Sequence, residues 1–270
     1  MAGNNVKIRY LPKRVYQPTD PKWTKRAIEA HKRTGTTFGK WHSFGNSEFG
    51  RSWDAMKALR EKCLPQLSGN VEPIKVLEIG AGQFPVEIFE IYDHLMKAGI
   101  QFKLAAMDIN LAFLQKIRDR KEISPIYNWF DVPTEYYSVF LGQAAPVGIC
   151  PWSLPVPNEV RERIELMQGD TAAVRLPQNS FDIIVCLNVL MYLKTGLAQA
   201  LAIQNMAEGL RSGGYLITDG FIGDKRYHLF NENTMGRMGF RSVERIDMER
   251  LKFSFGKFLD KYHQFVIQKN

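Results

Sequence analysis

Glycines and acidic residues placed directly after apolar strands are the residues of this sequence best suited to do chemistry. The segment VLEIGAGQFP (residues 76–85) runs from an apolar strand into Gly80 and Gly82. Glycines at such a point let the backbone turn sharply and approach a ligand closely. Asp108 ends the next apolar run, in AAMDIN, and Asp170 follows the run ELM. The pattern predicts a cofactor site at the ends of neighbouring strands.

A strand that leads through glycines into a helix is also typical of NAD-binding folds, so the turn alone does not identify the cofactor. Two features of this turn distinguish it from the NAD fingerprint. Pro85 stands where the third glycine of G-x-G-x-x-G belongs, and Glu78 lies inside the strand, two residues before Gly80. The turn therefore favours another cofactor.

The elements that must position these residues alternate along the chain. Their alternation predicts an α/β fold with a doubly wound, mainly parallel sheet and helices on both faces. Ligands of such sheets bind at the carboxyl ends of the strands. The periodicity predicts strands 74–79, 102–107, 163–167, 181–187 and 214–219, helices 84–98, 110–120 and 195–211, and a final strand pair near 240–248 and 261–268.

The charge is unevenly distributed, which suggests a division of the chain. Residues 1–70 hold 14 lysines and arginines against 5 acidic residues, so they carry all of the net charge of +8. Their composition and periodicity predict a basic, helical N-terminal segment, with helices over 20–34 and 51–64. Its charge is explained either by a solvated surface or by an acidic partner. We assign residues 71–270 to a catalytic domain. Within it, the Pro- and aromatic-rich insertion 124–158 is expected to act as a lid or a substrate-recognition element, with a packed subdomain as the alternative.

The composition is that of a globular protein, with 45% hydrophobic and 24% charged residues. The longest apolar run, 181–193, contains an Asp and an Asn and is too short to cross a bilayer. The first residues lack the apolar core of a signal peptide. Three cysteines and five histidines show no disulfide or metal-ligand spacing. We therefore expect a soluble, cytoplasmic protein with no metal and no contact with a membrane.

Taken in their order along the chain, these features resemble the class I S-adenosylmethionine-dependent methyltransferases over residues 74–219. The resemblance implies S-adenosylmethionine as cofactor and S-adenosylhomocysteine as product. It implies that the glycine turn faces the methionine part of the cofactor and that Glu78 belongs to the cofactor site. It further implies that Asp108, next to Ile109, binds the ribose hydroxyls, and that Asp170, next to Thr171, meets the adenine amino group.

A narrower resemblance is to the chemotaxis-receptor glutamate methyltransferases, the CheR family. It rests on GNSEFGRSWDAMKALREKCLPQL (45–67), on the long spacing from Glu78 to Asp108, and on CLNVLMY at the end of the fourth strand. By position, it implies that Asn188 contacts the cofactor and that Tyr192 and Arg51 line the methyl-acceptor site. The glycine turn departs from the family, because Gln83 and Phe84 replace two glutamates, and Leu187 replaces an arginine.

Three functions follow as expectations. The first is methylation of a carboxylate, such as a protein glutamate, which is already nucleophilic at neutral pH and requires no base. The second is methylation of an amine or hydroxyl in a small molecule, a peptide or RNA. That reaction releases a proton, and His42 is the histidine nearest the expected site in the sequence. The third is a binding protein that keeps the cofactor but has lost catalysis.

Overall fold

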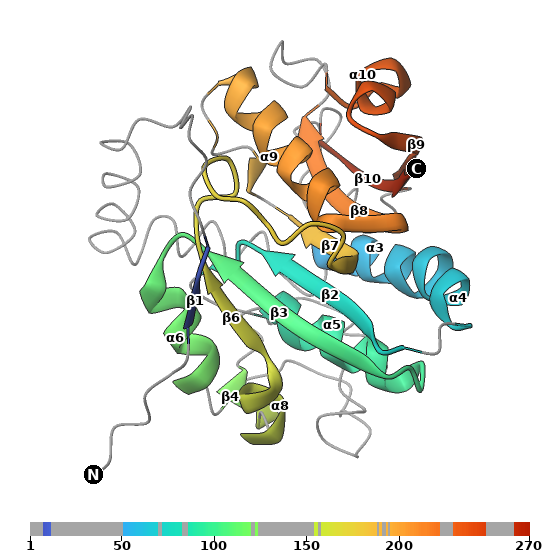
Figure 1. Ribbon diagram of the computed structural model, residues 1–270. Helices are drawn as coiled ribbons and strands as arrows, with labels where there is room; N and C mark the ends of the chain where they lie inside the picture. The colour runs from blue at the N-terminus through green and yellow to red at the C-terminus, as the bar shows by residue number, and fades with distance from the viewer. Residues whose placement is uncertain are drawn as a thin grey trace.

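A mixed β-sheet dominates the computed structural model, which describes residues 8–11, 51–69, 72–82, 86–119, 122–123, 154–155, 158–187, 189–190, 193, 195–221, 229–246 and 262–270. Within these residues, eight strands form one sheet in the order β1-β6-β3-β2-β7-β8-β10-β9 (Figure 1). The strands are β1 (Ile8–Tyr10), β2 (Ile74–Ile79), β3 (Phe102–Asp108), β6 (Glu165–Gln168), β7 (Phe181–Cys186), β8 (Leu210–Phe221), β9 (Phe240–Ile246) and β10 (Tyr262–Lys269). A separate ribbon pairs β4 (Glu122–Ile123) with β5 (Leu154–Pro155).

The sheet is mainly parallel, as the alternation of strands and helices predicts. The central pairs β3–β2, β2–β7 and β7–β8 are all parallel. Strand β10 is antiparallel to both of its neighbours, β8 and β9. This confirms the predicted α/β fold, including the final pair of strands.

Helices cover both faces of the sheet (Figure 1). The described helical segments are α3 (Arg51–Ala58), η1 (Leu59–Cys63), α4 (Leu64–Leu67), α5 (Val86–Lys97), α6 (Leu111–Asp119), α8 (Asn158–Arg163), α9 (Gly196–Gly209) and α10 (Glu232–Arg237). The helix predicted over 51–64 extends to residue 67 through one π-helical turn. The helix predicted over 20–34 and most of the insertion 124–158 lie outside the described residues.

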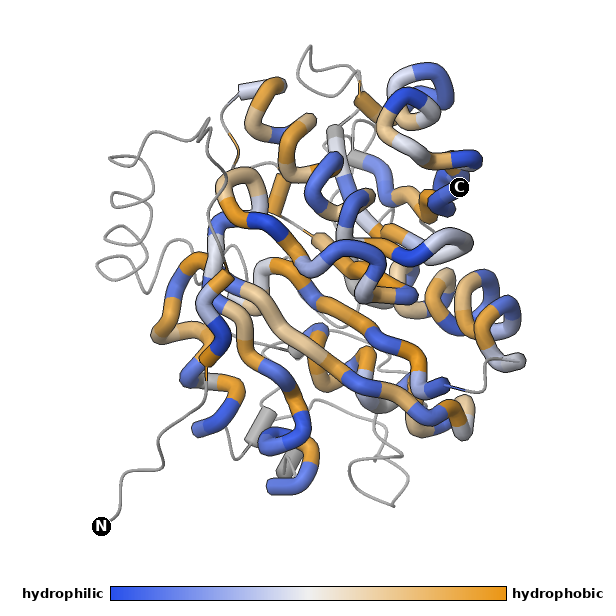
Figure 2. The backbone as a smooth tube through the Cα atoms, viewed as in Figure 1, coloured by the Kyte–Doolittle hydropathy of each residue, from blue (hydrophilic) through white to orange (hydrophobic). Residues whose placement is uncertain are grey.

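Alternation along each strand divides the core into two layers. Val76 packs with α5 and α3 on one face, whereas the next residue, Leu77, packs with α9 on the other. Successive side chains of a strand point to opposite faces, so one central strand supplies both layers. Figure 2 shows hydrophobic colour concentrated in the strands at the centre of the sheet.

The segment from α3 to α4 crosses one face of the sheet from its carboxyl edge to its amino edge (Figure 1). At its far end, Gln66 and Leu67 line a pocket with Arg211 and Gly213, which lie at the start of β8. A helical run from residue 51 to residue 67 is roughly 25 Å long. The run therefore ends at the amino edge of the sheet, and Arg51 is the first residue at its other end.

Candidate active site

The loops that follow β2, β3 and β6 meet around the carboxylate of Asp108. Its Oδ2 accepts a 2.9 Å hydrogen bond from the main-chain N–H of Gly82, and its Oδ1 accepts one of 2.7 Å from Asn110. The main-chain N–H of Gly80 donates to the carbonyl of Met107 at 2.7 Å, and that of Gly169 donates to the carbonyl of Asp108 at 3.1 Å. The predicted residues of three separate strands are thus brought together at one edge of the sheet.

Both glycines of the turn adopt conformations that other residues rarely take. Gly80 has φ +91° and Gly82 has φ +66°. A Cβ on Gly80 would overlap Cγ2 of Val189, in the segment that follows β7. Gly80 is therefore required both by its backbone conformation and by the close approach of the neighbouring loop.

Burial makes Asp108 a weaker acid than usual. Desolvation raises its pKa from 3.8 to about 6, although the main-chain N–H groups of Asn110, Gly82 and Ile109 act in the opposite direction. A buried carboxylate with two oxygens already held by amides is fixed in orientation. It is thus prepared to accept further hydrogen bonds from a ligand.

Glu78 and Glu87 are two further buried acids close to Asp108. Desolvation, followed by the charges of Glu87 and Asp108, raises the pKa of Glu78 well above its usual value. Within the described part of the chain, Oε2 of Glu78 is buried without a hydrogen-bond partner. Such a site is suited to a ligand that brings positive charge and hydrogen-bond donors.

Asp170 and Thr171 begin the loop between β6 and β7. Oδ1 of Asp170 accepts a 2.9 Å hydrogen bond from the N–H of Ala172, and its carbonyl accepts bonds from Ala173 and Val174. Both residues therefore belong to one compact turn beside Asp108. Thr171 is buried.

Two amide side chains on α9, which the sequence did not single out, hold loops of this site. Asn205 accepts a 3.0 Å hydrogen bond from the N–H of Leu176 and donates one of 3.0 Å to the carbonyl of Thr171. Gln199 donates to the carbonyls of Leu190 and Leu193, both at 3.1 Å. The signal in the sequence is weak, because the helix also carries the polar residues Gln204 and Glu208, and nothing sets Gln199 and Asn205 apart from them.

Some predicted site residues are not among those described. His42, Asn188 and Tyr192 lie outside the described residues. Arg51 is the first residue of α3, and its side chain is outside the described part. Their roles therefore stay predictions.

The model of the CheR methyltransferase, SAM-binding domain, matches residues 46–227. The chain belongs to the CheR methyltransferase family. This CheR-type chain is an S-adenosylmethionine-dependent methyltransferase, which confirms the enzyme class and the cofactor predicted from the glycine turn and the two acids. A comparison with curated proteins gives no match.

Two solved structures with TM-scores of 0.50 or more share the fold of this CheR-type chain, and a third resembles it more loosely. The N-methyltransferase NodS from Bradyrhizobium japonicum WM9, in complex with S-adenosyl-l-homocysteine, is 15% identical with a TM-score of 0.52, and the match covers 92% of this chain and 98% of NodS. The DszA carbon methyltransferase is 13% identical with a TM-score of 0.50, covering 81% and 54%. The CMeT domain of the citrinin polyketide synthase is 14% identical with a TM-score of 0.45, covering 73% and 46%. The chain thus spans about half the length of the latter two.

The described residues fit S-adenosylmethionine. A Cβ on Gly82 would meet nothing closer than the Gly80 carbonyl at 3.7 Å, so this backbone is open to close approach, and Asp108 offers oriented carboxylate oxygens. The buried acids Glu78, Glu87 and Asp108 suit a ligand that carries a sulfonium and an ammonium group. By contrast, no group of metal-ligating side chains is found in the described part. No described helix is long and apolar enough to cross a bilayer.

Proposed function

We propose that this methyltransferase acts on a carboxylate, such as a glutamate side chain of a protein. The observation that carries the proposal is the family match, because it covers α3 with Arg51 as well as the strands of the cofactor site. In such a reaction the protein mainly aligns the two reactants. Correct alignment alone lowers the activation free energy by roughly 7–11 kcal/mol.

In this proposal, the residues around Asp108 hold the cofactor, which supplies an electrophilic methyl group. The main chain of Gly80 and Gly82 faces the methionine part, and Glu78 balances its positive charge. Asp108 accepts hydrogen bonds from the ribose hydroxyls. The remaining members of the proposed cofactor site are Ile109, Asp170, Thr171 and Asn188.

The proposed acceptor site lies between α3 and the loop after β7. The guanidinium of Arg51 orients the acceptor carboxylate through paired hydrogen bonds, and Tyr192 positions the oxygen that takes the methyl group. The insertion 124–158 covers this site, and the basic N-terminal segment 1–70 meets an acidic partner. A carboxylate is ionised at neutral pH, so no base is required.

The experiment that tests the proposal is transfer of labelled methyl groups from S-adenosylmethionine into a host-cell extract, followed by mild alkali. Release of the label as volatile methanol supports a carboxyl ester. Label that resists alkali contradicts the proposal and favours an amine or hydroxyl acceptor, with His42 as the base to replace next.

Variants separate the proposed roles. Arg51→Ala and Tyr192→Phe should lower turnover roughly tenfold or more while leaving the affinity for S-adenosylhomocysteine unchanged. Arg60→Ala is the matched control, since Arg60 is an exposed cation of the same helical segment. Unchanged turnover in Arg51→Ala would contradict its assignment to the acceptor site.

A further inference from the structure

Two lysines lie side by side at the amino ends of the central strands. Lys75 of β2 is the direct register partner of Lys103 of β3 in a parallel pair. Register partners point to the same face, on strands roughly 4.8 Å apart. Like charges placed in this way destabilise a sheet. Within the described residues, neither ammonium group has an ion-pair partner, so the fold leaves this repulsion uncompensated.

Both lysines line a pocket of about 860 Å³. Arg163, which is exposed and also has no ion-pair partner in the described part, belongs to the same lining. The acid of the lining, Glu165, is bound by Arg9 at 3.3 Å. The pocket therefore carries a net positive charge that no described side chain neutralises.

The other wall of this pocket is apolar. It is formed by the end of α5 and the start of β3, with Tyr92, Met96, Ile100 and Phe102. The rings of Tyr92 and Phe102 meet edge to face with centroids 5.4 Å apart, and the exposed Met96 is at the rim. The pocket thus presents cations on one side and apolar surface on the other.

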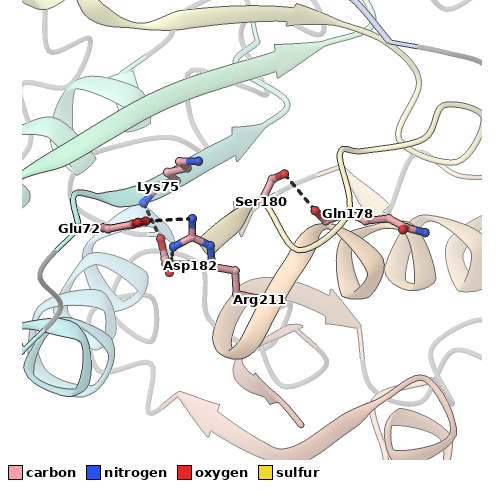
Figure 3. A network of polar contacts seen from close by, with 6 residues as sticks. All are labelled: Glu72, Lys75, Gln178, Ser180, Asp182 and Arg211. Atoms are coloured by element: carbon pink, nitrogen blue, oxygen red, sulfur yellow. Dashed lines mark hydrogen bonds and ion pairs between the residues drawn. The ribbon is translucent and has the colours of Figure 1, made fainter.

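A neighbouring network shows how the chain compensates charge elsewhere on the same edge (Figure 3). Arg211 lies 3.3 Å from the buried Asp182 and 3.8 Å from Glu72. The main-chain N–H of Lys75 donates to Asp182 at 2.7 Å, but the Lys75 ammonium points away from this network in Figure 3. Asp182 is therefore engaged by Arg211 and by a backbone amide, not by the Lys75 side chain.

We propose that this pocket, which we call the amino-edge groove, binds an extended acidic segment of a partner protein. Alternate residues of an extended chain point in opposite directions and lie roughly 6.6 Å apart. Acidic residues on one side of such a segment match the cations of Lys75, Lys103 and Arg163. Apolar residues on its other side match the wall formed by Met96 and Phe102. A sugar–phosphate backbone would leave this apolar wall unfilled.

The amino-edge groove is distinct from the methyl-transfer site. It lies where β2, β3 and β6 begin, whereas Gly80, Asp108 and Gly169 lie where these strands end. Strand β3 has 7 residues, which places the two sites roughly 20 Å apart. A segment in the groove therefore leaves the cofactor site open.

The test is direct binding of a fluorescent peptide of alternating Glu and Leu residues, followed by anisotropy. We expect saturable binding that weakens with salt and is lost when Gln replaces Glu in the peptide. The double variant Lys103→Glu/Arg163→Glu should weaken binding roughly tenfold or more, and Lys103→Gln should weaken it less. The matched control is Arg237→Glu/Arg245→Glu, which makes the same charge change on exposed residues of α10 and β9 and should leave binding unchanged.

A second readout separates binding from damage to the fold. Lys103→Glu should raise the thermal midpoint by about 1–3 °C, because it replaces the repulsion with Lys75 by attraction. Loss of binding together with higher stability supports the proposal. It is overturned if the wild type does not bind the peptide saturably at low salt, or if the control variant loses as much affinity. Tighter binding of single-stranded DNA or of phosphatidylglycerol vesicles would overturn the assignment of the partner. No methyl acceptor is needed, so the outcome is independent of the proposed function.

Discussion

The main-chain N–H of Gly82 donates a 2.9 Å hydrogen bond to Oδ2 of Asp108, and this contact joins the turn after β2 to the end of β3. The bond couples the two elements that the sequence singles out for the cofactor. Any change of the Asp108 side chain therefore alters both the ligand contact and the loop that faces it.

Replacement of Asp108 by Ala should weaken the binding of S-adenosylhomocysteine roughly 10- to 100-fold, because hydrogen bonds to a charged group are worth about 1.5–3 kcal/mol. Calorimetric titration measures this directly. The matched control is Asp182→Ala, which removes another buried acid that accepts a main-chain hydrogen bond, but at the opposite edge of the sheet. Equal losses in both variants would mean that Asp108 acts only through the fold.

Cofactor affinity should depend on pH through Asp108, whose pKa is about 6. As the pH falls through this value, the carboxylate is protonated and becomes a poorer acceptor for the ribose hydroxyls. We expect the Kd for S-adenosylhomocysteine to rise below pH 6 in the wild type. A variant Asp108→Asn should bind weakly but lack this inflection. A wild-type Kd that does not change between pH 5 and pH 8 would contradict the assignment.

The same carboxyl should destabilise the cofactor-free protein as the pH rises. Its pKa is higher in the folded chain than its ordinary value of 3.8, so the folded state binds more protons between these values. Asp108 therefore contributes a loss of stability between about pH 4 and pH 6, on the order of 3 kcal/mol. Urea unfolding across this range should show a smaller loss in Asp108→Asn than in the wild type. An identical pH dependence of the two proteins would exclude this contribution.

A Gly80→Ala substitution should cost roughly 1–3 kcal/mol of unfolding free energy and weaken cofactor binding. The reasons are its φ of +91° and the overlap of a new Cβ with Val189. Gly236→Ala is the control, because Gly236 lies in α10 and a Cβ there meets nothing within 4 Å. That control should stabilise the protein by roughly 0.5–1 kcal/mol. Chemical denaturation of the two variants measures both changes in the free energy of unfolding.

Removal of the Asn205 side chain should loosen the loop of Asp170 and Thr171. Asn205→Ala leaves the N–H of Leu176 and the carbonyl of Thr171 without their partner. The free energy of unfolding should therefore fall by roughly 2–4 kcal/mol. Cofactor affinity should fall as well, although Asn205 lies behind the loop. Gln204→Ala, at the neighbouring exposed position, should change neither quantity by more than about 0.5 kcal/mol. Hydrogen exchange of the Leu176 amide reports the loosening directly.

The strands and the cofactor turn could be predicted because their signals are local. Periodicity marks β2, β3 and β7, and glycines followed by a helix mark the turn at Gly80. Strand β1 could not be predicted, because three residues carry no usable pattern. Its pairing with β6 joins Arg9 to Glu165, 156 positions away.

Pairs formed by the topology were likewise hidden from the sequence. In the sequence, Lys75 and Lys103 look like ordinary residues near the starts of two strands. They become register partners only because β2 and β3 are neighbours in the sheet. The amides of Asn205 and Gln199 look like polar residues of a helix surface. Their role appears only once α9 packs against loops that come from other parts of the chain.

The place of β10 between β8 and β9 has a consequence for synthesis of the chain on the ribosome. Strand β9 leaves the ribosome before β10, yet its bonds to the sheet pass through β10. Until residues 262–269 emerge, the edge of β8 is open and β9 has no place in the sheet. An open strand edge is a template for aggregation. The nascent chain is therefore most open to aggregation in the interval between the emergence of β9 and that of β10.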